Sequence, residues 1–314
     1  MIVTMLGDPR KNMYIGIFWK IASCFCFAGV NGLVRYLSGG SSLELAEPLP
    51  IYIIMFFQNI IGTIIILPIL LLKNKETVYS MLKTKYRMLH IVRVTTAAIG
   101  IGLWYLSLQY IPLTQVIALS FAAPFIAIIG AVILLQEQLN IYRIIGIILS
   151  IIGGFLIARP DLGLKSSSYI GWLAVLPLLA TLIFEVDKLI ARKLLANGES
   201  AIGITLFLIA FTAPLCLLPT LYYGWHAPDI THWPWLLLLG IFGVCAHFTF
   251  SKAFVYAEIT TLMPFSITKI IFCGLIGYFI FAELPKTLDM WLGIIVATTS
   301  AIILNYERKK SVET

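Results

Sequence analysis

Long apolar runs, separated by short polar segments, follow one another along nearly the whole chain. A helix of about 20 apolar residues crosses the hydrocarbon core of a bilayer, because each residue advances about 1.5 Å along the axis. The runs predict an all-α integral membrane protein with ten transmembrane helices in contact with the lipid bilayer. The expected helices are 14–37, 50–72, 89–110, 113–135, 142–158, 169–191, 201–222, 233–256, 259–282 and 288–305.

Composition agrees with this pattern, since 60% of the residues are hydrophobic and only 12% are charged. The 22 Lys and Arg residues outnumber the 15 Asp and Glu residues, but most lie at the ends of apolar runs. We therefore interpret them as topology signals and expect no nucleic-acid partner. With ten helices, 13 of the basic residues fall on one side of the membrane and 4 on the other. The positive-inside rule then places both termini in the cytoplasm.

The sequence carries no pattern typical of a metal site, a cofactor site or an enzyme active site. All five cysteines lie inside apolar runs, without a Cys-x2-Cys pair or a histidine cluster nearby. A phosphate-binding glycine loop, a Gly-x-Ser-x-Gly turn and a His-Glu-x-x-His helix are also absent. We expect no metal, no cofactor and no catalytic residue.

An internal repeat relates the two halves of the chain. A constant shift of 146 residues aligns segment 107–139 with segment 253–285 without a gap. The shift matches Tyr110 with Tyr256, Thr114 with Thr260, Ser120 with Ser266 and Glu137 with Glu283.

Each half therefore holds five helices, in residues 1–160 and 161–314. Because five is an odd number, the second copy enters the membrane upside down relative to the first. This predicts two inverted five-helix repeats, the architecture on which alternating access is built.

The same residues carry a resemblance to a known family. A proline followed thirteen residues later by a glutamate ends one expected helix, at Pro124 and Glu137, and basic residues end two others, at Arg35 and Arg192. In these features the chain resembles the drug/metabolite transporter superfamily of the EamA type. The resemblance implies two five-helix halves around a central cavity lined mainly by helices 1, 3, 4, 6, 8 and 9, in a bacterial inner membrane.

Segments 90–125 and 178–194 resemble, more narrowly, the branch that contains S-adenosylmethionine uptake carriers. One position departs from the family. Members often carry an acidic residue followed by a proline where this chain has Lys269 and Ile270. The replacement of a carboxylate by an ammonium puts a preference for cationic substrates in doubt.

Helix faces with polar or aromatic residues at intervals of three or four positions indicate where such a cavity lies. Small residues on these faces, such as Gly100 and Gly243, are expected to let helices pack closely. We select eight candidates for substrate binding: Asn31, Arg93, Trp104, Ser120, Glu185, Asp187, His247 and Lys269.

The lysine at 269 lies about ten residues into its expected helix, about 15 Å from the start and near the midplane. An ionised side chain there is unfavourable by about 2.5–3.5 kcal/mol. Lys269 could pair with Glu185 or Asp187, face a wet cavity, or lose its proton.

The other candidates each have two interpretations. Glu185 can pair with Lys188 three positions away, whereas Asp187 points elsewhere and needs another partner. Arg93, like Lys20 and Lys252, either lines the cavity or extends along the helix to the cytoplasmic surface. Trp104 either stacks on a planar or cationic ligand or packs, and His247 is either a core histidine or a proton relay.

These observations favour a permease for a small polar or amphoteric metabolite, working by alternating access. Uptake of S-adenosylmethionine is the leading possibility, and export of amino acids, related metabolites or drugs is the alternative. A membrane enzyme or a channel explains fewer of the features. Transport without a nucleotide-binding segment follows a gradient, exchanges solutes or couples to an ion, and the sequence leaves these open.

Overall fold

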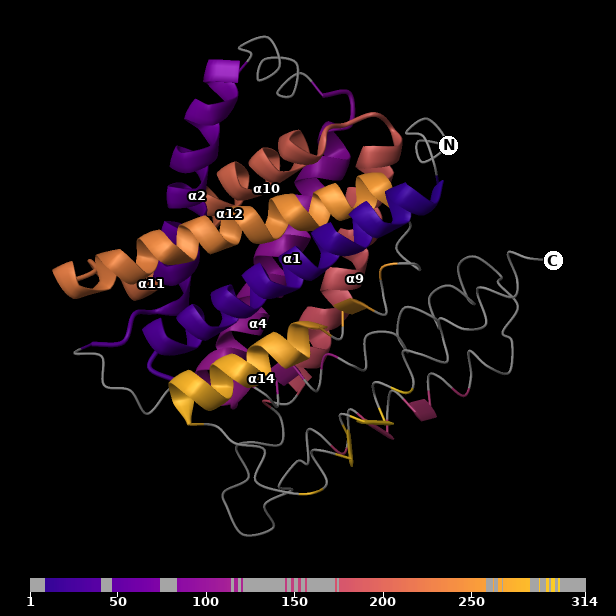
Figure 1. The fold of residues 1–314 in the computed structure, drawn as a ribbon. Helices are drawn as coiled ribbons and strands as arrows, with labels where there is room; N and C mark the ends of the chain where they lie inside the picture. The colour runs from indigo at the N-terminus through magenta and orange to yellow at the C-terminus, as the bar shows by residue number, and fades with distance from the viewer. Residues whose placement is uncertain are drawn as a thin grey trace.

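A computed structural model describes residues 9–40, 47–73, 84–113, 175–257 and 268–282, with isolated positions between and after these ranges (Figure 1). Every regular element in these ranges is helical. The elements are α1 (Pro9–Leu37), α2 (Ile51–Lys73), α4 (Arg87–Tyr110), α9 (Val175–Ala196), α10 (Ala201–Leu215), α11 (Thr220–Tyr223), the 3-10 helix η3 (Ile230–His232), α12 (Trp233–Tyr256) and α14 (Thr268–Phe281).

Five helices in the described ranges are long and apolar enough to cross a membrane: Asn12–Leu37, Ile51–Leu72, Arg87–Tyr110, Ala201–Tyr223 and Ile230–Tyr256. They agree with five of the expected spans, which confirms the all-α membrane class. The expected helices 113–135, 142–158 and 288–305 fall almost wholly outside the described residues, as do Glu137 and Glu283. The number of ten helices, the inverted repeat and the boundary at residue 160 therefore stay predictions.

Helix α9 departs from its expected bounds, because it continues to Ala196 and not to residue 191. Gly198 ends it, with a positive φ of 90° that favours glycine, while the amide of Glu199 donates to the carbonyl of Leu194. Ser200 then caps α10 by accepting from the amide of Gly203. The short connection between α9 and α10 is thus set by glycine and serine.

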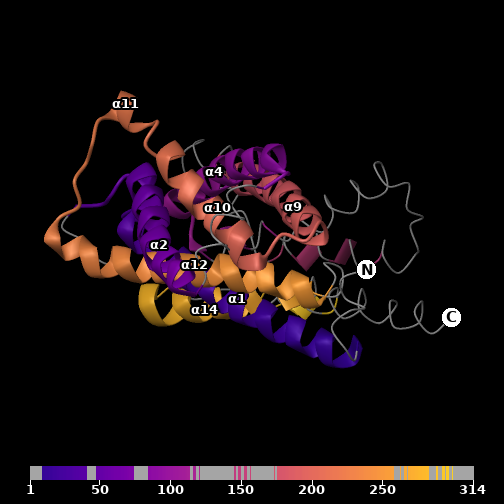
Figure 2. The same ribbon diagram turned by 90° about the horizontal axis from the view of Figure 1, so that it is seen from above.

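The helices pack as two groups that meet in the interior. Helix α1 lies between α12 and α14, whereas α4 packs on α9 and α10 (Figures 1 and 2). Helix α2 joins the groups by packing on both α12 and α10. The charged residues of α9 and the lysine of α14 therefore belong to different groups of helices.

Glycines allow the closest helix contacts. A Cβ placed on Gly240 would lie 2.5 Å from Ile61 Cγ2, and one on Gly243 would lie 2.7 Å from Gln58 Nε2. A Cβ on Gly100 would lie 3.0 Å from side chains of Ile183 and Phe184. The packing role predicted for Gly100 and Gly243 is confirmed.

The end of α1 is bound to the end of α4. The Arg35 guanidinium donates through Nη1 to the carbonyls of Leu108, at 2.9 Å, and Ile111, at 2.6 Å. Both acceptors lie in the last turn of α4 or directly after it, where carbonyls lack helical partners. Arg35 is buried and satisfies them with a positive charge.

Candidate substrate site

Lysines and aromatic rings from four helices meet in the interior. The Lys269 ammonium on α14 lies 4.7 Å from the ring centroid of Trp104 on α4 and 5.8 Å from that of Phe27 on α1. The Phe250 ring of α12 is 6.2 Å from that of Phe27, and the Lys20 ammonium is 5.4 Å from the Phe250 ring centroid. We call Lys20, Phe27, Trp104, Phe250 and Lys269 the lysine–aromatic cluster.

Asn31 fixes the orientation of the tryptophan in this cluster. Its side-chain oxygen accepts from Trp104 Nε1 at 3.0 Å, and its Nδ2 points to Cys273 Sγ at 3.8 Å. Trp104 is 3% exposed and Asn31 is 2% exposed. The amide thus connects α1 with both α4 and α14 beside Lys269.

Neither lysine of the cluster has a carboxylate within ion-pair distance, 4.0 Å, among the residues that the structure describes. Both instead lie over aromatic faces, which attract a cation through the ring quadrupole. Lys20 is only 8% exposed, so the expected extension of this side chain to the cytoplasmic surface is wrong. Packing against Phe250 holds it inside.

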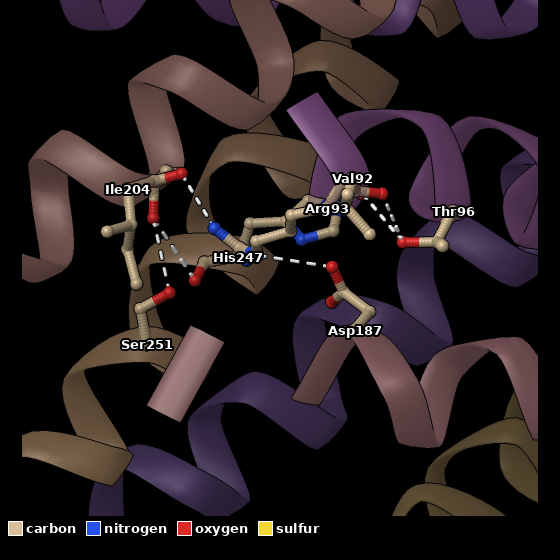
Figure 3. A network of polar contacts seen from close by, with 8 residues as sticks. Val92, Arg93, Thr96, Asp187, Ile204, His247 and Ser251 are labelled. Carbon is tan, nitrogen blue, oxygen red and sulfur yellow. Dashed lines mark hydrogen bonds and ion pairs between the residues drawn. The ribbon is translucent and has the colours of Figure 1, made fainter. Parts of the chain in front are cut away.

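The two acidic candidates on α9 have other partners. Glu185 pairs with Lys188 one turn along, which confirms the predicted local pair. Asp187 pairs with Arg93 on α4, with 3.1 Å between Oδ1 and Nε (Figure 3). Lys269 is therefore paired with neither carboxylate, and of its three possible environments the internal ion pair is not the one observed.

The arginine of that pair is fully enclosed. Arg93 is 1% exposed, and its Nη1 donates to the carbonyl of Ile204 on α10 at 2.8 Å (Figure 3). It cannot reach the surface along its helix, so the expected extension to the cytoplasmic surface is wrong here as well. Helices α4, α9 and α10 are joined by this one side chain.

His247 lies beside the cluster from α12. Its ring packs edge-on against Phe27, with 5.3 Å between centroids. Its backbone carbonyl accepts from the Thr205 hydroxyl, which also contacts the Ser251 hydroxyl, each at 3.4 Å. The proton-relay role for His247 stays a prediction.

Ser120 stands at an isolated described position. Its hydroxyl donates to the carbonyl of Ile117 at 2.6 Å, a bond within its own turn. Nothing in the described part of the chain links it to the lysine–aromatic cluster, and its role in substrate binding stays a prediction.

A second polar group was not singled out from the sequence. The buried His90 ring lies 3.8 Å from Glu199 Oε1, and the hydroxyl of Thr84 donates to the same oxygen. His90 also packs on Phe207, at 4.2 Å between centroids. The spacing of His90 and Arg93, one turn apart on α4, was the available signal, but Glu199 comes from a distant connection.

Replacing Asn31 by leucine is expected to lower stability by about 1–3 kcal/mol, because the indole N–H of Trp104 loses its acceptor in a buried place. Thermal unfolding of the purified protein measures this. Asn59 offers the matched control, since its Nδ2 donates to Met55 of the same helix and joins no second helix. An equal effect of Asn31→Leu and Asn59→Leu would contradict a special role for Asn31.

Residues 14–159 match the EamA-like transporter family. The described helices α2 and α4 and all but the first five residues of α1 lie within this range, and the resemblance noted in the sequence is confirmed. Residues 14–159 thus form an EamA-like transporter region, of the type found in the drug/metabolite transporter superfamily.

Two relatives that are named as transporters match this chain over nearly its whole length. It is 29% identical over 303 residues to a riboflavin transporter of Vibrio cholerae, covering 94% of this chain and 95% of the relative. It is 25% identical over 304 residues to the S-adenosylmethionine uptake transporter of Rickettsia bellii, covering 97% and 98%. The protein is therefore a membrane transporter.

A solved structure, described as the crystal structure of a protein, has the same fold. Its TM-score to this chain is 0.66 at 12% identity, covering 92% of this chain and 98% of that one. At this level of identity the likeness concerns the fold alone.

Proposed function

We propose that the protein is a secondary carrier for a small polar or amphoteric metabolite with a planar ring, and that S-adenosylmethionine is the first candidate. The observation that carries the proposal is Lys269 at the face of Trp104, beside Asn31. A ring face, an amide and an ammonium at one place suit a ligand that has both a flat heterocycle and polar groups.

The two relatives support the same substrate class. One is named for riboflavin and the other for S-adenosylmethionine. Both compounds join a flat nitrogen heterocycle to a hydroxylated five-carbon group, but only S-adenosylmethionine carries an amino acid group. Riboflavin is therefore the second candidate.

Three residues have assigned roles in this proposal. Trp104 faces the heterocycle, Lys269 the carboxylate of the ligand, and Glu185 its cationic part. Arg93 and Asp187 neutralise each other at 3.1 Å, so they hold α4 and α9 together in the resting state.

Transport is proposed to proceed by alternating access between two inverted halves, with both termini in the cytoplasm of a bacterial cell. Neither a driving ion nor a counter-substrate is assigned. Because alternating access is reversible, the gradient determines import or export, and efflux from loaded vesicles tests the export alternative.

Uptake into proteoliposomes tests the proposal. We expect saturable uptake of S-adenosylmethionine or riboflavin and no uptake of a neutral sugar, with initial rates at least tenfold lower in Lys269→Ala. Lys252→Ala is the control, because Lys252 lies over Tyr256, outside the cluster. Uptake of sugars alone would overturn the substrate class, and an unchanged rate in Lys269→Ala would overturn the role of this lysine.

A further inference from the structure

We propose that the lysine–aromatic cluster is an anion subsite, so that it binds a ring compound with a carboxylate more tightly than a neutral one and favours S-adenosylmethionine over riboflavin. The inference rests on the proposed function and narrows its substrate class. It comes from the charges that remain after every internal ion pair of the described residues is formed.

The ion pairs leave an excess of positive charge. Arg93 is neutralised by Asp187, and Lys188 by Glu185. Lys20 and Lys269 remain without a carboxylate within 4.0 Å among the described residues. Lys20 and Lys188 repel Lys269 at longer range, and Glu185 attracts Lys20, also at longer range, so two carboxylates are shared among four cationic side chains. A carboxylate bound at the cluster would relieve this repulsion, whereas a positively charged group bound there would add to it.

The rings are a weaker partner for these ammoniums than an acid. The attraction of an ammonium to an aromatic face is smaller than the unfavourable energy of placing that ammonium inside a membrane. Hydrogen bonds between an ammonium and a carboxylate or phosphate are shorter and about twice as strong as neutral ones. An acidic ligand is thus the partner that this pair of lysines lacks.

The position of Lys269 also links recognition of the acid to recognition of the ring. Its ammonium occupies the face of Trp104 at 4.7 Å, so a ligand ring can use that face only after the ammonium moves. Asn31 holds the indole in place through its 3.0 Å bond and prevents the ring from turning away. An acidic group draws the ammonium off the indole and exposes the face, but a neutral ring brings nothing in exchange.

A matched pair of ring compounds tests this without knowledge of the physiological substrate. The probes are 2-naphthoate and 2-naphthylmethanol, which share the ring and differ in the acidic group. Their affinities for the purified protein are measured by titration calorimetry, with thermal stabilisation as a second measurement. We expect wild type to bind naphthoate at least tenfold more tightly than the alcohol.

The variants assign the preference to the cluster. Lys269→Gln and Lys20→Gln should each lower the preference to below threefold, and Lys269→Arg, which keeps the charge, should retain it. Lys252→Gln is the control that should leave it unchanged. Equal affinities in wild type, no binding of either probe, or a full preference in both glutamine variants would overturn the anion subsite. An uncharged Lys269 would give the first of these results.

The outcome is separable from that of the uptake assay. A preference for naphthoate without uptake of any ring metabolite leaves the subsite standing and removes the proposed function. Uptake of riboflavin or S-adenosylmethionine by a protein that does not distinguish the probes keeps the function and removes the subsite.

Discussion

Replacing Asp187 by alanine is expected to lower the free energy of unfolding by about 3–5 kcal/mol, the largest effect of any single change that we foresee. The variant leaves the Arg93 guanidinium 1% exposed and without a counter-charge. The bond to the carbonyl of Ile204 cannot neutralise a full charge. Thermal unfolding in detergent, followed by size-exclusion chromatography, measures the loss.

Two further variants separate a buried charge from a general packing defect. The double change Arg93→Met with Asp187→Leu removes both charges and should recover most of the stability, because apolar residues of similar volume often replace a buried ion pair without loss. Glu185→Ala removes an acid whose lysine partner is 30% exposed, so its effect should be below about 1 kcal/mol. A double variant as unstable as Asp187→Ala would contradict this explanation.

Gly240→Val is expected to lower stability by about 1–3 kcal/mol, because it forces α12 away from α2. A Cβ at this position lies 2.5 Å from Ile61 Cγ2 and 2.8 Å from Ile61 Cβ. The second atom is bound to the backbone, so a change of rotamer cannot relieve the overlap. Expression level and thermal unfolding of the purified protein measure the effect.

Gly274 is the matched control for this substitution. It also lies inside a helix, α14, but a Cβ there would meet nothing within 4 Å. Gly274→Val should therefore change the unfolding temperature little. If both valine variants are equally unstable, the β-branched side chain and not the contact with Ile61 is responsible.

The helices of the described ranges could be predicted because each is specified locally. The expected span 233–256 coincides with α12, and 201–222 differs by one residue from the apolar stretch Ala201–Tyr223. Helix α9 is the exception. Its charged residues weaken the apolar signal, and its end depends on the left-handed conformation of Gly198, which hydropathy does not report.

The pairing of charges could be predicted only within one helix. Glu185 and Lys188 are one turn apart, so their contact follows from helical geometry. The partner of Asp187 depends on which residue of α4 lies opposite it, and that is decided by the packing of two helices distant in sequence. For Lys269 the sequence suggested carboxylate partners, whereas the observed neighbours are the rings of Phe27 and Trp104, on helices that are distant in sequence.

The bonds of Arg35 bear on how this molecule could move. Separating the end of α1 from the end of α4 breaks two charge-assisted hydrogen bonds, which would cost about 3–6 kcal/mol. These bonds keep the two helix ends together. A movement of α1 relative to α4 is therefore expected to be a rotation about this joint and not a translation along α4. If α1 swings about this joint, Lys20, which is fifteen residues from Arg35, travels farther than Phe27, which is eight residues from it.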